Sequence, residues 1–156
     1  MKDYDTRVAR VCSRLNAEGA RYVLVGSTAM QLWGTTRAAR EVGILIEPSI
    51  SNARNVLRAL AALDFGFATE QLIKDTATRA VTVIGSNPVV AIITRAGSLN
   101  WKAAHARATI FHIEGVAIPA ASIADLITSK QTGLEHDRTD IQELETIARY
   151  IASAGA

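Results

Sequence analysis

The run Val42–Ile46 constrains the fold most, because it is apolar at nearly every position. Strands of this composition are usually buried on both faces of a sheet, whereas a strand with one exposed face alternates apolar and polar residues. Ser49–Leu63 follows with helical spacing of apolar residues and begins with a good helix-capping serine. A β-rich run at Arg21–Val25 is likewise followed by a helical pattern at Thr28–Trp33. The sequence therefore predicts strands and helices in alternation around a buried sheet.

Two hairpins are expected further along the chain. Ala80–Ile84 and Val89–Thr94 are β-rich runs joined by the turn residues Gly-Ser-Asn-Pro, which favours antiparallel pairing. Ala108–Ile113 and Val116–Ile118, separated by Glu-Gly, predict a second hairpin.

Helical spacing completes the predicted fold. Thr69–Arg79 is compatible with a helical turn or with an irregular loop. Apolar periodicity predicts three further helices, at Tyr4–Leu15, Ala121–Gln131 and Asp137–Ser153. We therefore expect an α/β (α+β) fold: a mixed sheet with flanking helices and a C-terminal helix pair.

Composition limits the class of protein. The 156 residues are 49% apolar and 21% charged, which predicts one globular domain over residues 1–156. The net charge of +2 gives no strong electrostatic case for nucleic acid. Cys12 is the only cysteine, so no disulfide forms within the chain. The charged start and the lack of an apolar run near about 18 residues argue against secretion and against a membrane partner. We expect a cytoplasmic location.

The dipeptide Gly26-Ser27 lies between a predicted strand and a predicted helix. Such a junction gathers free backbone N–H groups at a helix N-terminus, where the helix dipole favours an anion such as phosphate. The alternative interpretation is a tight turn that needs a small residue.

The stretch Tyr22–Pro48, YVLVGSTAMQLWGTTRAAREVGILIEP, resembles the nucleotidyltransferase superfamily. The similar branch comprises minimal nucleotidyltransferases and the nucleotidyltransferase-type toxins of toxin–antitoxin pairs. The shared pattern is a strand, Gly-Gly or Gly-Ser, a short helix with a late aromatic residue before Gly, an Arg, and carboxylates that run into a strand. The resemblance continues through Val89–Thr94 and through Ile118–Leu144, where Lys130, Asp137 and Asp140 stand in matching positions.

The resemblance implies transfer of a nucleoside monophosphate from a nucleoside triphosphate to a hydroxyl group. It also implies two magnesium ions held by three carboxylates, because two such ions about 3.5 to 4 Å apart need several oxygen ligands. Glu41 stands at the first carboxylate position, but Gly43 and Ala91 stand at the second and third. Glu41 is thus the candidate catalytic and metal-binding residue. The nucleotide-binding candidates that the resemblance implies are Gly26, Ser27, Arg37 and Lys130.

Three functions follow as alternatives. The first is a pseudoenzyme that binds a nucleotide or phosphate and whose two-metal catalysis is lost or weakened. The second is an active transferase that uses Glu41 and one magnesium ion, with an RNA, a protein or a small molecule as the acceptor. The third is a structural or interaction module that uses the old cleft as an interface, for example in a homo-oligomer.

Several candidate residues also have structural interpretations. Glu41 also suits a solvated carboxylate paired with Arg37 or Arg40, and Lys130 suits the C-terminal end of a helix dipole. Gly43 within a buried strand would allow close approach of another backbone or of a ligand.

Overall fold

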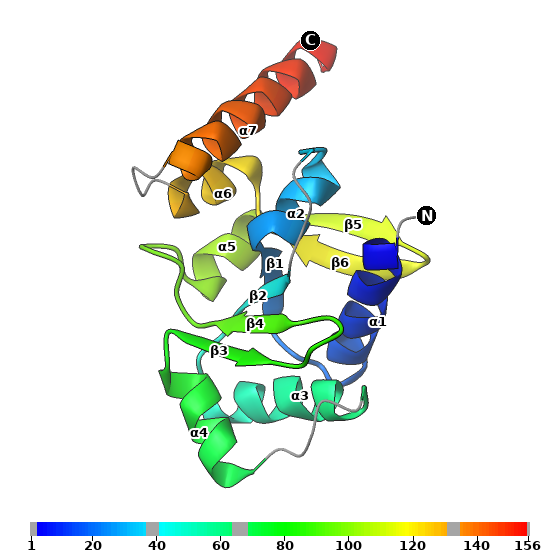
Figure 1. Cartoon of the computed structure of the whole chain (residues 1–156), viewed down its shortest axis with the longest axis vertical. Helices are drawn as coiled ribbons and strands as arrows, with labels where there is room; N and C mark the ends of the chain where they lie inside the picture. The colour runs from blue at the N-terminus through cyan, green and yellow to red at the C-terminus, as the bar shows by residue number, and fades with distance from the viewer. Residues whose placement is uncertain (1–2, 37–40, 64–68, 131–134, 156) are drawn as a thin grey trace.

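A computed structural model describes residues 3–36, 41–63, 69–130 and 135–155. These residues form seven helices and a six-stranded mixed sheet, which confirms the predicted fold class (Figure 1). The helices are α1 (Asp3–Ala17), α2 (Gly26–Trp33), α3 (Ile50–Ala61), α4 (Glu70–Thr78), α5 (Trp101–Arg107), α6 (Ile123–Ser129) and α7 (Glu135–Ala154). The strands are β1 (Tyr22–Val25), β2 (Val42–Ile46), β3 (Val81–Ile84), β4 (Val90–Ile93), β5 (Thr109–Ile113) and β6 (Val116–Ala120).

The strands lie in the order β3-β4-β2-β1-β6-β5. Both predicted hairpins, β3–β4 and β5–β6, pair antiparallel and form the two sides of the sheet. Between them, β1 pairs antiparallel with β2, while β2 is parallel to β4 and β1 is parallel to β6. Every residue of β1 and β2 is buried, as their continuous apolar sequences predict. The centre of the sheet is therefore covered on both faces.

At three segments the structure differs from the sequence-based prediction or decides between two alternatives that it left open. The helix α2 begins at Gly26, directly after β1, so no loop separates strand from helix. The segment left open as a helical turn or a loop is a helix, α4. The helix α5 was not predicted, because only Ala104 in its seven residues is fully buried and so few positions give no readable apolar period.

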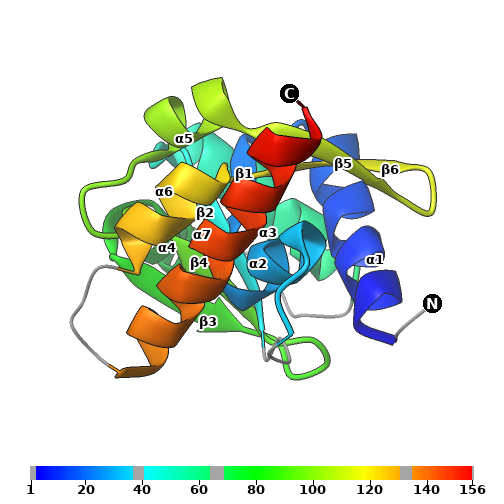
Figure 2. The same cartoon turned by 90° about the horizontal axis from the view of Figure 1, so that it is seen from above.

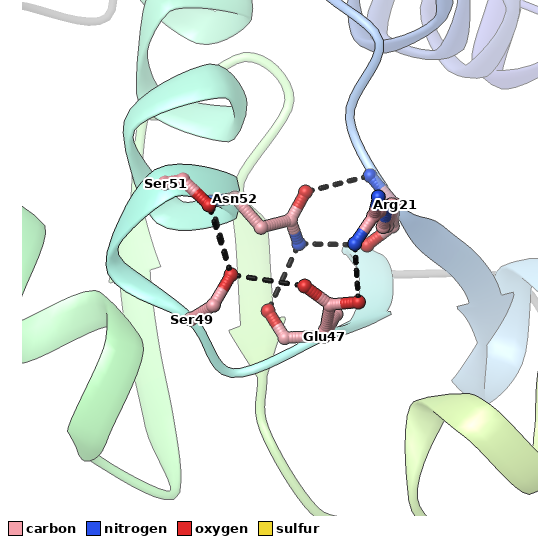
Figure 3. A network of polar contacts seen from close by, with 5 residues as sticks. All are labelled: Arg21, Glu47, Ser49, Ser51 and Asn52. Carbon is pink, nitrogen blue, oxygen red and sulfur yellow. Dashed lines mark hydrogen bonds and ion pairs between the residues drawn. The ribbon is translucent and has the colours of Figure 1, made fainter.

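The start of α3 is fixed to the sheet by Asn52, whose side chain is buried (Figure 3). Its amide oxygen accepts a hydrogen bond from the backbone N–H of Arg21 at 2.7 Å, and its amide nitrogen donates to the carbonyls of Arg21 and Glu47, both at 2.9 Å. The Arg21 guanidinium pairs with Glu47 at 2.7 Å, and Ser49 donates to the other carboxylate oxygen of Glu47. This network joins the start of β1, the end of β2 and the first turn of α3.

The last helix, α7, extends away from the sheet toward its C-terminal end (Figure 1). Tyr150 and Ile151 near that end are exposed, whereas Leu144 is fully buried. Among the residues that the structure describes, no helix is long and apolar enough to cross a lipid bilayer.

Candidate functional site

Residues of three neighbouring strands, β1, β2 and β4, lie side by side near one end of the sheet. Val25, the last residue of β1, is the register partner of Gly43 on β2, and Gly43 is in turn the register partner of Ala91 on β4. Since Gly43 and Ala91 each stand second in their strands, both lie at the same sheet end as the start of α2. The structure thus gathers three of the sequence candidates, Gly26, Ser27 and Glu41, at this end. Gly43 and Ala91, which replace the expected second and third carboxylates, lie there too.

The N-terminus of α2 has no side-chain cap. Gly26 opens the helix with a backbone φ of 69°, a left-handed conformation that glycine adopts without steric cost. The residue before it, Val25, provides no capping hydrogen bond, and the first turn contains no acidic residue. By contrast, four other helices are capped by a side-chain oxygen, from Ser49, Thr69, Asn100 and Ser122. The half-buried Ser27 therefore lies at the positive end of the α2 dipole. The side chain of Val25 accepts no hydrogen bond that would offset this partial charge.

Glu41 is exposed and immediately precedes β2. Its backbone carbonyl accepts a hydrogen bond from the hydroxyl of Thr28 at 2.6 Å. Thr28 is buried in the first turn of α2, so this bond fixes the start of β2 against the uncapped helix end. Thr28 is a residue that the sequence analysis missed, since a threonine after Gly-Ser gives no signal of its distant partner.

Gly43 is enclosed by the backbone of β1. A Cβ atom at this position would lie 3.1 Å from the carbonyl oxygen of Val25, which is closer than most side chains tolerate. This geometry agrees with the structural interpretation of Gly43, in which glycine permits close approach of another backbone. Ala91 beside it is also buried. The positions of the second and third carboxylates are therefore occupied by residues that fit closely packed strands.

The site does not fit a pair of magnesium ions. Glu41 is the one acidic residue among the three positions that the resemblance assigns to metal ligands. Across the described ranges of the chain, no group of three or more His, Cys, Asp or Glu residues is arranged to hold a metal ion. A two-metal site needs several convergent oxygen ligands, and these residues do not supply them.

Lys130 is engaged in ion pairs between the last two helices. It is the C-cap residue of α6, and its Nζ lies 3.4 Å from a carboxylate oxygen of both Asp137 and Asp140 on α7. Both carboxylates are buried. These pairs give Lys130 a structural role in joining α6 to α7, in addition to the predicted nucleotide contact. Arg37, the remaining nucleotide-binding candidate, lies outside the described residues.

Comparison with known proteins adds no assignment to this geometry. No protein-family model matches the chain, and no curated protein matches its sequence. The nucleotidyltransferase resemblance, the toxin–antitoxin association and the cytoplasmic location therefore stay predictions.

Proposed function

We propose that the protein binds a nucleotide or another phosphate compound at the N-terminus of α2, and that it lacks two-metal nucleotidyl transfer. The observation that carries this proposal is the uncapped α2 N-terminus, held by Thr28 against the strand that begins after Glu41. The backbone N–H groups of the first turn and the helix dipole favour a phosphate there, and the Ser27 hydroxyl supplies a further donor.

Loss of catalysis follows from the residues around that helix end. Two-metal transfer needs carboxylates on adjacent strands to hold both ions. At Gly43 the Val25 carbonyl leaves little room for any side chain, and at Ala91 a methyl group is buried. Glu41 alone brings one carboxylate, so the proposed binding does not depend on a magnesium pair.

Isothermal titration calorimetry with ATP, GTP, CTP and UTP, each with magnesium or with EDTA, tests the proposal. We expect binding in both conditions. Ser27→Glu places a carboxylate at the α2 N-terminus, where it competes with phosphate but interacts favourably with the dipole, so binding should be lost while the protein stays folded. Ser51→Glu is the matched control, because Ser51 is also the second residue of its helix, α3. Absence of binding to any of the four nucleotides and to inorganic phosphate contradicts the proposal.

An active transferase is the second candidate, since Glu41 is exposed at the same sheet end as Ser27. Incubation with labelled nucleoside triphosphates and total RNA or protein separates the two functions. Label transfer that Glu41→Ala abolishes would establish the enzyme and overturn the pseudoenzyme. Nucleotide binding without any transfer supports the pseudoenzyme. If neither occurs, the third function, an interaction module, replaces both.

A further inference from the structure

The helix α1 presents three arginines along one side. Arg7, Arg10 and Arg14 are spaced i, i+3 and i+7, which brings their side chains onto neighbouring positions of the helix surface. Arg10 is exposed, and the other two are half-buried. The helix lies beside the β5–β6 hairpin in both views (Figures 1 and 2).

These arginines line two adjoining hollows. The larger, of about 280 Å³, lies between Arg10 and Arg14 of α1, Leu63 after α3, and Glu114 and Val116 at the β5–β6 turn. The smaller, of about 20 Å³, extends past Arg7 to the β3–β4 turn at Asn87 and Pro88. Because both hollows are lined by Arg10 and Leu63, they form one elongated depression, which we call the α1 groove.

The arginines of the α1 groove have unused hydrogen-bonding capacity. The Nε atom of Arg14 is buried and has no hydrogen-bond partner in the described part of the chain. Its terminal nitrogen is 3.5 Å from Glu18, a long contact on the same helix. Arg7 donates to the side-chain oxygen of Asn87 at 3.0 Å, so its charge has a neutral partner there. The terminal nitrogens of Arg14 are thus weakly paired, and a ligand carboxylate would add a charge-assisted hydrogen bond to them.

The charge and the lining of the groove indicate the chemistry of its ligand. Among the described residues, Glu114 is the one carboxylate that lines the groove, and Glu18 pairs with Arg14. Three arginines therefore outnumber two carboxylates, which favours an anionic ligand at the Arg7–Arg10 end. Ala9, Leu63 and Val116 add an apolar lining near Arg14. A nucleic-acid backbone would gain little from that lining, whereas a peptide with both carboxylates and apolar side chains would contact it fully.

We propose that the α1 groove binds an acidic, amphipathic peptide segment of a partner protein. The carboxylates of the segment pair with Arg7, Arg10 and Arg14, and its apolar side chains pack on Leu63 and Val116. This groove shares no lining residue with the proposed phosphate site at α2, and neither proposal depends on the other.

Selection of random phage-displayed peptides on the full-length chain tests the proposal. The variant in which Arg7, Arg10 and Arg14 are all replaced by Ala serves for counter-selection. We expect the enriched peptides to be rich in Asp and Glu with interspersed apolar residues. Fluorescence anisotropy with the best fluorescein-labelled peptide should show about tenfold weaker binding for Arg10→Ala and for Arg14→Ala, and weaker binding at high salt. The matched control Arg149→Ala, an exposed arginine on α7, should bind as the original chain does.

Several results would overturn the proposal. One is a selection that enriches no peptide over the triple variant, or peptides without an excess of carboxylates. A second is a peptide whose affinity Arg10→Ala leaves unchanged while circular dichroism shows the variant folded. A third is Arg10-dependent binding of fluorescein-labelled poly(U) that exceeds the peptide affinity, which would assign the groove to RNA. A dimer in sedimentation analysis that Arg10→Ala dissociates would assign it to a second copy of the chain.

Discussion

Gly43 on β2 and Ala91 on β4 are register partners on adjacent parallel strands, at the positions where the nucleotidyltransferase resemblance requires its second and third carboxylates. Both residues are buried, and the carbonyl of Val25 lies too close to Gly43 for an unstrained side chain. The missing second carboxylate is therefore coupled to the spacing of β1 and β2, because a side chain at Gly43 requires the Val25 carbonyl to shift by a few tenths of an ångström.

The close approach at Gly43 predicts a stability cost for the smallest possible side chain. Gly43→Ala should lower the free energy of unfolding by about 1 to 2 kcal/mol, because the added methyl group overpacks the β1–β2 contact. Urea denaturation measures this difference. Gly155→Ala is the matched control, since a Cβ atom there meets its nearest neighbour at an ordinary 3.5 Å. If both variants were as stable as the original chain, the strands would have room for a Cβ atom at position 43, and the prediction would be wrong.

The sequence predicted the central strands and both hairpins, because long apolar or β-branched runs bounded by turn residues leave few other arrangements. It did not predict α5, whose seven residues give too short a pattern. Gly26, Ser27 and Glu41 could be nominated from local motifs, and the strand order places them at one sheet end.

Contacts between distant segments were beyond sequence reasoning. The approach of Val25 to Gly43, the bond from Thr28 to Glu41, and the pairing of Lys130 across two helices depend on how the elements pack. Asp137 illustrates the difficulty. It lies near the start of α7, which begins at Glu135, and its partner Lys130 belongs to another helix, so the sequence gives no signal of the pair.

The Lys130 ion pairs predict a large effect of removing their cation. Lys130→Met leaves Asp137 and Asp140 buried without this positive partner, which should cost about 3 kcal/mol of unfolding free energy. Adding Asp137→Asn and Asp140→Asn to the same variant should recover part of that loss. Urea denaturation provides the measurement, with Lys74→Met on the exposed side of α4 as the control. A loss no larger than that of the control would show that the pairs contribute little.

Glu47 predicts a pH-dependent term in stability. The hydrogen bond from Arg21 lowers the pKa of the Glu47 carboxyl, partly offset by desolvation, and Ser49 lowers it further. A carboxyl whose pKa is lowered on folding stabilises the protein above its ordinary pKa of 4.5, and this contribution disappears as the pH falls through the lowered pKa. Glu47→Gln should therefore be less stable than the original chain at neutral pH, and the gap should narrow in acid. The measurement is the urea midpoint of both proteins from neutral pH into acid. A difference in stability that stays constant with pH would show that the prediction is wrong.

Cys12 should be chemically inert in the folded protein. Burial raises the pKa of its thiol to about 12, a change that the hydrogen bond with Tyr22 only partly opposes. Since the thiolate is the reactive species, labelling by Ellman's reagent at pH 8 should be negligible in buffer and should follow the unfolding transition in urea. Ser13→Cys in the Cys12→Ser background is the matched control, because the neighbouring position is exposed and should label at once. Rapid labelling of Cys12 in buffer would contradict the burial of this helix face.

Asn52 offers the sharpest test of how α3 is attached to the sheet. Its side chain makes three hydrogen bonds to backbone groups of Arg21 and Glu47, so Asn52→Ala leaves one N–H and two carbonyl groups without these partners. We expect a loss of about 2 to 3 kcal/mol in urea denaturation. Asn52→Asp keeps only the acceptor for the Arg21 N–H and should also be destabilised, whereas Asn55→Ala on the same helix should change stability by less than about 0.5 kcal/mol. Equal effects at the two positions would mean that the loss reflects the helix itself and not its attachment to β1 and β2.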